Sequence, residues 1–409
     1  MNSAPEPGRS PKLQGIDFKR AAIDYPSKLS AERLQHLRTK PFYNLANKLS
    51  KFRGHGMDAD THRHFCDFAN MAVALDLPAG ARILDVACGS GWLSEYFARL
   101  GYDVTGIDIS PQLVQISEER IQALPPLVDP ETPIRCRFLV HDIELAPLPE
   151  KFDAIVCYDS MHHFEDARSA LRHITGMLPL GGVLFILEGE RPPSGSRGEA
   201  ELTDVMQKFG TLESPFDPAF LHQLLDQSGL AVIGDYVSVN GLFYREALDE
   251  EGRLRVQAPR SNYLLCKKVS EEGPASSVSD SRSPDVLRAE IAIESPWAAE
   301  FKPGDVFVVS VNVRNTGNTL WLGGNFLRRG AVTLGVKIIN QTGEVLEEFH
   351  GEPALPRGVA PNESCSVIIE RSVPRTPGSY TLKVDLVDQH ICWFEERGSE
   401  PLLLPLTVV

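Results

Sequence analysis

The chain lacks any long apolar run. Its 409 residues are 42% hydrophobic, yet no segment approaches the roughly 20 uninterrupted apolar residues that a membrane-spanning helix needs. The N-terminal stretch MNSAPEPGRSPKLQG also lacks the apolar core of a secretion signal, and its Pro, Gly and Ser content predicts a disordered lead-in over residues 1–28. We therefore expect neither export nor integral membrane association.

Positive charge is scarce as well. The chain has 41 Lys and Arg residues against 55 Asp and Glu residues, which gives a net charge of -14. Such a surplus of acid argues against binding to the phosphate backbone of nucleic acid. Seven cysteines, an odd number without the spacing of a disulfide framework, suit a reducing compartment. The prediction is a cytoplasmic protein that does not bind nucleic acid.

Short apolar segments alternate with amphipathic ones over residues 29–269. Two helical segments come first, and then apolar runs such as RILDVA, DVTGIDI and VLFILEG are separated by helical patterns such as PQLVQISEERIQAL. Buried strands between amphipathic helices are typical of a parallel sheet covered on both faces. This pattern predicts an α/β domain with a Rossmann-like, doubly wound, seven-stranded sheet.

The pattern changes after residues 270–285, a segment rich in Ser and charge that we expect to be a linker. From there on, apolar and polar residues alternate with a period of two, as in DVFVVSVNVRNTG and YTLKVDLVD, and turn signals separate the runs. Residues 286–409 are therefore predicted to form an all-β sandwich of immunoglobulin-like type.

A glycine turn follows the first predicted strand, in the segment ILDVACGSGWL over residues 83–93. Glycine has no Cβ and tolerates positive φ, so such a turn lets backbone N–H groups approach a ligand. A dinucleotide fingerprint would require a third glycine where the chain has Ser94, and a phosphate loop would require Lys followed by Ser or Thr. The turn thus predicts a cofactor site of another kind.

Acidic residues mark the ends of the first three strands: Asp85 just before the turn, then Asp108 and Asp142. They suit a cofactor with an ammonium group near Asp85, a ribose diol that donates to Asp108, and an adenine amino group that donates to Asp142. S-adenosylmethionine carries these groups and no phosphate.

These motifs resemble, in order and spacing, those of class I S-adenosylmethionine-dependent methyltransferases. The matching segments are DVACGSG, GIDIS, HDIE, FDAIVCYDSMHHFED and LPLGGVLFI, and Ala87 stands where the family often has glycine. The resemblance covers about residues 79–269 and implies a methyltransferase domain over 29–269, with the N-terminal helices as a lid. It implies cofactor contacts from Asp85, Ala87, Cys88, Gly89, Gly91, Asp108, Ile109, Asp142, Ile143, Cys157 and Tyr158.

Two adjacent histidines, His162 and His163, follow the fourth strand on the side where such sheets bind ligands. One of them could act as a general base on an acceptor hydroxyl, and neighbours point in different directions, so the other should pack or cap. The sequence does not separate the two. Asp159 completes the predicted catalytic set, and no metal site is predicted because a second ligand group at the usual spacing is missing.

Other residues could touch the cofactor or acceptor. His55, His62 and Arg63 precede the first strand and could contact the methionine carboxylate, while Glu188 and Arg191 follow the fifth strand on the active side. The segment GTLESPF could belong to an insert that covers the substrate.

The sandwich contains three of the four tryptophans, which could stack on sugar rings if exposed. Its sequence resembles β modules of surface-polysaccharide enzymes. This resemblance implies O-methylation of a saccharide or glycolipid hydroxyl. Two alternatives stay open: a small hydrophobic metabolite as acceptor, with the sandwich mediating homodimerisation or docking, or a cofactor-binding scaffold without catalysis.

Overall fold

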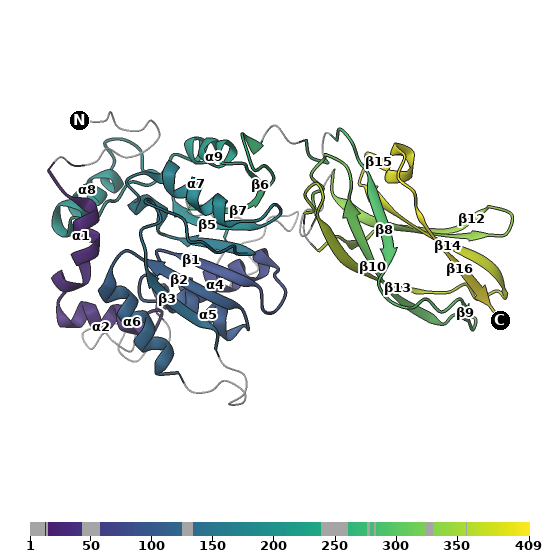
Figure 1. Ribbon diagram of the computed structural model, residues 1–409, viewed down its shortest axis with the longest axis horizontal. Helices are drawn as coiled ribbons and strands as arrows, with labels where there is room; N and C mark the ends of the chain where they lie inside the picture. Colours follow the sequence, from purple (N-terminus) through teal and green to yellow (C-terminus); the bar gives the residue numbers. More distant parts are fainter. Residues whose placement is uncertain are drawn as a thin grey trace, which may run out of the picture. The chain divides into compact units, whose positions relative to one another are not determined.

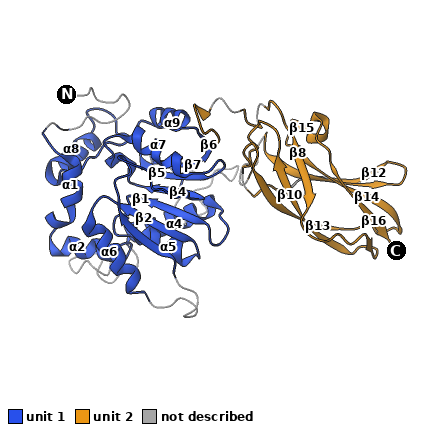
Figure 2. Ribbon diagram, in the orientation of Figure 1, with its two compact units in different colours: residues 1–268 blue, residues 269–409 orange. Residues whose placement is uncertain are grey.

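The computed structural model describes residues 13, 15–42, 58–124, 134–238, 261–275, 279–281, 284–323, 330–356 and 358–409. The chain divides into two compact units, residues 1–268 and residues 269–409 (Figure 2). Within the described residues, no helix is both long enough and apolar enough to cross a bilayer. All seven cysteines are free thiols.

The first unit is built on a seven-stranded sheet (Figure 1). The strand order is β3-β2-β1-β4-β5-β7-β6, and β7 runs antiparallel to both β5 and β6, whereas the other pairs of neighbours are parallel. This confirms the predicted doubly wound, seven-stranded sheet. The strands are β1 (Arg82–Val86), β2 (Asp103–Asp108), β3 (Cys136–Val140), β4 (Ala154–Tyr158), β5 (Val183–Gly189), β6 (Leu230–Tyr236) and β7 (Ser261–Lys268).

Helices cover both faces of this sheet, which explains why its strands read as continuous apolar runs. In β1, Ile83 packs in the cluster that includes Phe97, whereas Leu84 packs in the cluster that includes Leu171, and both are fully buried. The covering helices are α4 (Ala59–Leu75), α5 (Trp92–Arg99), α6 (Pro111–Gln122), α7 (Ala167–Met177) and α9 (Pro218–Gln227), whereas α8 (Arg197–Phe209) packs through Met206 against Phe18 and Leu212.

The N-terminal segment is more ordered than its composition predicts. Residues 18–28 form α1 (Phe18–Asp24) and the short 3-10 helix η1 (Tyr25–Lys28), so the expectation of a disordered lead-in over residues 1–28 is wrong for this part. Asp17 caps α1 by accepting from the Arg20 N–H, and Phe18 is buried against Met206 and Leu212. Tertiary packing, which composition does not report, orders the segment.

The first of the two helical segments predicted ahead of the sheet is confirmed. It is α2 (Ala31–Thr39), and the Ser30 hydroxyl accepts from the Arg33 N–H at its start. It ends at Thr39, one residue before the Lys40–Pro41 peptide bond.

The second unit consists of two sheets, ordered β13-β10-β8 and β12-β11-β14-β16-β9, with β15 paired to β14. Apolar residues from both sheets share one core, and the period-two pattern is confirmed because alternate residues of β10 are buried. The immunoglobulin-like type stays a prediction. The elements are β8 (Ala289–Ile293), β9 (Glu300–Phe301), β10 (Val306–Asn315), β11 (Val332–Asn340), β12 (Val345–Ala354), β13 (Ser364–Ser372), β14 (Gly378–Asp388), β15 (Cys392–Trp393), the 3-10 helix η5 (Phe394–Arg397) and β16 (Leu402–Val408).

Part of the segment predicted as a linker, residues 270–285, instead packs on the second unit. Ala275 is buried, and Ser281 is fully buried with its hydroxyl donating to the Gly330 carbonyl and accepting from the Leu322 N–H. The expectation of an unpacked linker is wrong here, because a small serine can satisfy buried backbone groups that composition does not reveal.

Candidate functional site

A cavity of about 390 Å³ lies at the carboxyl ends of the central strands of the first unit. It takes lining residues from the ends of β1, β2 and β4, from the loop after β3, from α1 and α2, and from the segment after α8. Of the residues predicted for the site, the lining includes Asp85, Ala87, Cys88, Gly89, Asp108, Ile109, Asp142, Ile143, Tyr158, Asp159 and His163. The structure places Gly91, Cys157 and His162 outside that lining, and Cys157 is fully buried.

The glycine turn adopts the left-handed backbone that its sequence anticipates. Ala87, Gly89 and Gly91 have φ values of 56°, 58° and 71°. Ala87 therefore holds a conformation that glycine adopts at lower cost. A Cβ added at Gly91 would lie 2.7 Å from the Ser117 Cβ, so this glycine permits close packing behind the cavity rather than contact with a ligand.

Cys88, also in the turn, is buried, and burial raises the pKa of its thiol well above the usual range. A thiol that resists ionisation is a poor nucleophile. Cys88 therefore serves as a small residue that fits the wall of the cavity.

Asp108 is fixed by the turn that it faces. Its carboxylate accepts from the Gly89 N–H at 3.0 Å and from the Ser110 N–H at 2.8 Å. Burial raises its pKa to about 6 in spite of these bonds. A carboxylate held from two sides keeps its remaining lone pairs directed toward the cavity that it lines.

Asp85 is the last but one residue of β1 and is almost completely buried. Its carboxylate accepts from the Ser94 hydroxyl at 2.6 Å. Burial, aided by the negative charge of Asp108, raises its pKa to about 7, although the Ser94 bond and the Lys40 charge act in the opposite direction. A cationic ligand beside Asp85 would stabilise the ionised form of this carboxyl group.

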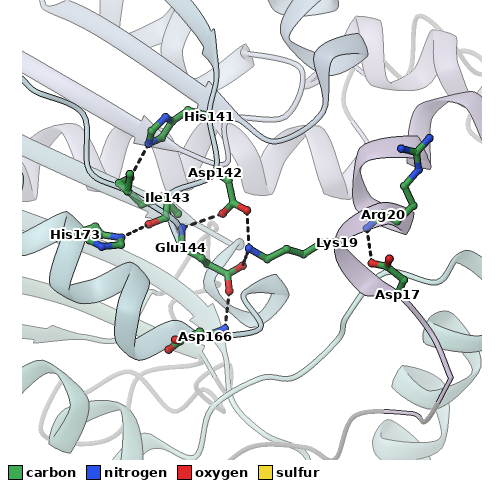
Figure 3. A network of polar contacts seen from close by, with 10 residues as sticks. Asp17, Lys19, Arg20, His141, Asp142, Ile143, Glu144, Asp166 and His173 are labelled. Carbon is green, nitrogen blue, oxygen red and sulfur yellow. Dashed lines mark hydrogen bonds and ion pairs between the residues drawn. The ribbon is translucent and has the colours of Figure 1, made fainter. Parts of the chain in front are cut away.

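Asp142 is already bonded to a helix that the sequence analysis did not connect with the site (Figure 3). Its Oδ2 accepts from the Lys19 ammonium of α1 at 2.6 Å, and its Oδ1 accepts from the Glu144 N–H at 2.9 Å. Lys19 also lies 3.5 Å from Glu144 Oε1. The helix α1 is therefore held at the β3 end of the cavity by a charged contact.

Tyr158 forms part of the cavity wall, and its hydroxyl is bonded to other parts of the fold. The hydroxyl donates to Asp67 Oδ2 at 2.7 Å, and Tyr263 of β7 donates to Oδ1 of the same carboxylate at 2.9 Å. Arg63 donates to the Tyr158 hydroxyl at 3.2 Å. The carboxylate of Asp67 thus fixes the orientation of the Tyr158 ring.

Three residues were expected near the methionine carboxylate. Arg63 is engaged by Tyr158 and Asp67, and His62 lies 3.7 Å from the Cys66 sulfur; neither lines the cavity. His55 lies outside the described residues. The structure brings Lys40 to the cavity instead. No signal in the sequence distinguishes this lysine from others near the N-terminus.

The two adjacent histidines have different environments. His162 donates from Nδ1 to Glu188 Oε2 at 2.7 Å, and its Nε2 lies 3.4 Å from Glu213 Oε2. Burial alone would lower the pKa of His162, but the Glu188 carboxylate raises it well above the usual range. His162 is consequently a buried cation that connects Glu188 of β5 with Glu213 of the segment after α8. Glu188, which was expected on the active side, is the hydrogen-bond partner of this histidine.

His163 lines the cavity and donates from Nδ1 to the Leu212 carbonyl at 2.5 Å. Because a carbonyl only accepts, Nδ1 carries a hydrogen and Nε2 is the acceptor of the neutral ring. The His163 side chain is 40% exposed, so its removal from water is partial; this partial desolvation lowers its pKa, and the positive charge of His162 lowers it further. The segment GTLESPF does border the cavity through Thr211, Leu212 and Glu213, whereas Arg191 does not line it.

Potential metal ligands do gather next to these histidines. They form two groups, in each of which every residue offers one nitrogen or oxygen atom within 4.8 Å of the others. The first group is His162, His163 and Glu213, and the second is Asp159, His162 and Glu188. The His162 nitrogens face the two glutamates, and His163 Nδ1 faces a carbonyl. The contacts form a hydrogen-bonded network, and the absence of a metal stays a prediction.

The cavity fits the cofactor that the sequence implies. Its volume lies in the range of about 300–1,000 Å³ that small-molecule sites occupy. Asp85, Asp108 and Asp142 all line it, so acceptors for an ammonium group, a ribose diol and an adenine amino group are present in one cavity. S-adenosylmethionine would be held by these three carboxylates, by the backbone of the glycine turn and by the ring of Tyr158.

Binding of this cofactor is expected to weaken as the pH falls. Ionised Asp85 and Asp108 are the better acceptors, and their pKa values of about 7 and about 6 mean that protons compete with the ligand below neutrality. The affinity for S-adenosylhomocysteine, measured by calorimetry, should drop about 10-fold between pH 8 and pH 6. In the Asp85→Asn variant, this affinity should depend less on pH near pH 7. A wild-type affinity that does not change with pH would contradict the assignment of Asp85 and Asp108 to the cofactor site.

Comparisons with known proteins identify a methyltransferase domain in the first unit. Residues 84–186 match a family model described as a methyltransferase domain. The chain is 37% identical over 126 residues to the ubiquinone biosynthesis O-methyltransferase of Xanthomonas campestris pv. campestris (strain B100), which covers 30% of this chain and 49% of the relative. The corresponding protein of Xanthomonas axonopodis pv. citri (strain 306) is 38% identical over 119 residues, or 29% of this chain and 46% of the relative.

Solved structures are also similar. Magnesium protoporphyrin IX methyltransferase from Synechocystis PCC 6803, with bound S-adenosylmethionine, is 17% identical with a TM-score of 0.41 and covers 63% of this chain and 100% of its own. A methyltransferase from Methanosarcina mazei is 18% identical with a TM-score of 0.38 and covers 49% and 97%. The chain spans about half the length of the curated relatives that it matches. Residues 84–186 of the first unit thus match a methyltransferase domain, as the motifs of the sequence predict.

Proposed function

We propose that the protein transfers the methyl group of S-adenosylmethionine to a hydroxyl group of an acceptor. The observation that carries the proposal is the state of His163. It lines the cavity, its Nδ1 is fixed by the Leu212 carbonyl, and partial desolvation lowers its pKa, so a neutral ring offers Nε2 as a proton acceptor. A base of this kind suits an oxygen acceptor, which has to lose a proton.

The residues around the cavity would orient the reactants and receive the proton. Bound S-adenosylmethionine would supply an activated methyl group. Alignment of acceptor and donor provides most of the acceleration in such a displacement, up to about 7–11 kcal/mol. His163 Nε2 would accept the hydroxyl proton, and the imidazolium so formed would be stabilised by Glu213, whose Oε1 lies 3.9 Å from Nδ1. Asp159, on the same wall, would help to orient the acceptor.

The apolar part of the lining supports a hydrophobic acceptor. The apolar side chains that line the cavity from α1, α2, α8 and the neighbouring segments are Phe18, Leu37, Phe164, Val205, Phe209 and Leu212. They suit a hydroxylated aromatic or another small hydrophobic metabolite. The names of the relatives, which refer to ubiquinone biosynthesis, support the same class.

The second candidate acceptor is a saccharide or glycolipid, for which the second unit would provide recognition. Its tryptophans offer limited support. Trp321 is fully buried, and Lys337 lies 3.8 Å above the ring of Trp393. Trp297 packs against Phe301 and donates to a backbone carbonyl. A role of the second unit in homodimerisation or docking remains our alternative proposal.

A labelled-methyl transfer screen with the full chain tests the proposal. Purified protein and labelled S-adenosylmethionine would be incubated with hydroxylated aromatics, saccharides, glycolipids and matched compounds whose hydroxyl is already methylated. We expect label in hydroxylated aromatics and none in the methylated controls. Transfer to saccharides alone would favour the second candidate. Cofactor binding without transfer to any hydroxyl would favour the cofactor-binding scaffold and contradict the proposal.

A further inference from the structure

The cavity contains a lysine whose ammonium group forms no ion pair within the described part of the chain. Lys40 directly follows α2 and lines the cavity. Its Nζ lies 5.7 Å from the ring centroid of Trp92 and 5.9 Å from that of Tyr158. Among the described residues, this ammonium makes neither an ion pair nor a hydrogen bond. The aromatic faces stabilise the cation in part, and its hydrogen-bond donors stay available to a ligand.

The position of Lys40 is fixed by the backbone. Arg120 of α6 donates to the Lys40 carbonyl at 2.5 Å and to the Arg38 carbonyl at 2.9 Å. The same guanidinium donates to the Ser90 carbonyl in the glycine turn at 3.0 Å and pairs with Glu95 at 2.9 Å. Arg120 thereby attaches the end of α2 to the turn that faces the cofactor.

Lys40 lies at the Asp85 end of the cavity. Burial lowers the pKa of Lys40 to about 8, while the carboxylates of Asp159 and Asp85 raise it and Arg63 lowers it. The Lys40 charge in turn lowers the pKa of Asp85. The other lysine of the lining, Lys19, is paired with Asp142 and Glu144 at the opposite end. The ammonium group at the Asp85 end can therefore bind an anionic group of a ligand, whereas the ammonium group at the Asp142 end is already paired.

We propose that Lys40 binds the carboxylate of the amino-acid end of the cofactor and that Arg120 acts as its positioning residue. The proposal rests on the proposed function, because it takes S-adenosylmethionine as the ligand. That ligand ends in an ammonium and a carboxylate on one carbon atom. Asp85 suits the ammonium, and the carboxylate requires a cation beside it, which Lys40 supplies.

Two ligands that differ in the amino-acid end test this assignment. S-adenosylhomocysteine has the carboxylate, whereas 5′-deoxy-5′-methylthioadenosine keeps the adenosyl thioether and lacks it. In Lys40→Met, calorimetry should show the Kd of the first ligand raised about 10- to 100-fold and that of the second changed by less than about twofold. Lys40→Arg should recover part of the loss. Lys151→Met, which removes an exposed lysine outside the cavity lining, is the matched control and should change neither Kd.

The same ratio of dissociation constants tests Arg120. Arg120→Met should selectively weaken S-adenosylhomocysteine, and the double variant with Lys40→Met should lose little more than Lys40→Met does. Equal weakening of both ligands in Lys40→Met would overturn the proposal, since it would indicate a collapsed cavity. Unchanged affinity, or a higher KM for the acceptor alone, would overturn it too. A wild-type protein that binds neither ligand would instead refute the proposed function.

Discussion

Asp108→Ala should weaken binding of S-adenosylmethionine by about 100-fold or more. The variant removes the acceptor for two ribose hydroxyl groups, each of which would form a bond to a charged group worth about 1.5–3 kcal/mol. It also frees the Gly89 N–H, which donates to Asp108, so the glycine turn loses a contact that shapes it. Calorimetric titration of the cofactor into folded protein provides the measurement.

Two companion variants isolate the carboxylate. Asp108→Asn preserves the shape and one acceptor oxygen, and should fall between the wild type and Asp108→Ala. Asp103→Ala removes an acidic residue from the other end of the same strand, outside the cavity lining, and should bind normally. Undiminished binding in Asp108→Ala would remove this residue from the site.

His163→Ala should lower kcat by about 10²- to 10⁴-fold, with the Kd of the cofactor changed by less than about threefold. The reason is that His163 would receive the acceptor proton, whereas the cofactor is held by the strand ends. In the wild type, kcat should rise with pH as the imidazolium of His163 deprotonates, at a pKa below the usual histidine value. Single-turnover rates measured across pH in both proteins test this, and a His163→Ala variant with normal kcat would contradict the assignment.

His162→Ala should act differently, although the residue is adjacent. Its Nδ1 donates to the fully buried Glu188, so the variant removes the cation beside this carboxylate, which keeps the N–H groups of Ser160 and Met161 as donors. Breaking a buried ion pair costs about 3–5 kcal/mol in the free energy of unfolding. Chemical denaturation compares the two variants, and the double variant with Glu188→Gln should recover part of the lost stability. Equal losses of stability in the two histidine variants would show that their environments are not distinct.

The first unit could be predicted closely from sequence because its local signals agree with its packing. Strands buried on two faces need apolar residues at every position, as Ile83 and Leu84 show, and the acids at strand ends meet because parallel strands share one edge. The lead-in and the linker were misjudged for a common reason. Phe18 and Ser281 are buried by contacts with residues distant in the sequence. The amino-acid composition of a segment does not predict such contacts.

The candidate site was predictable on one side only. The strand ends contribute Asp85 and Asp108 through motifs, whereas Lys19 and Lys40 arrive from N-terminal helices whose docking depends on tertiary contacts. Likewise, adjacency in the sequence could not assign different roles to His162 and His163. Their difference depends on Glu188 and the Leu212 carbonyl, which belong to separate segments of the chain.

The attachment of α2 by Arg120 has a consequence for how this cavity can change. The guanidinium holds carbonyl oxygens at positions 38 and 40, which every amino acid possesses, and not their side chains. The main chain can thus remain docked whatever residue occupies position 40. The side chain at position 40 can therefore be exchanged, by evolution or by protein engineering, while the backbone that carries it stays in place. Such an exchange changes the chemical group that faces the ligand and leaves the rest of the cavity as it is.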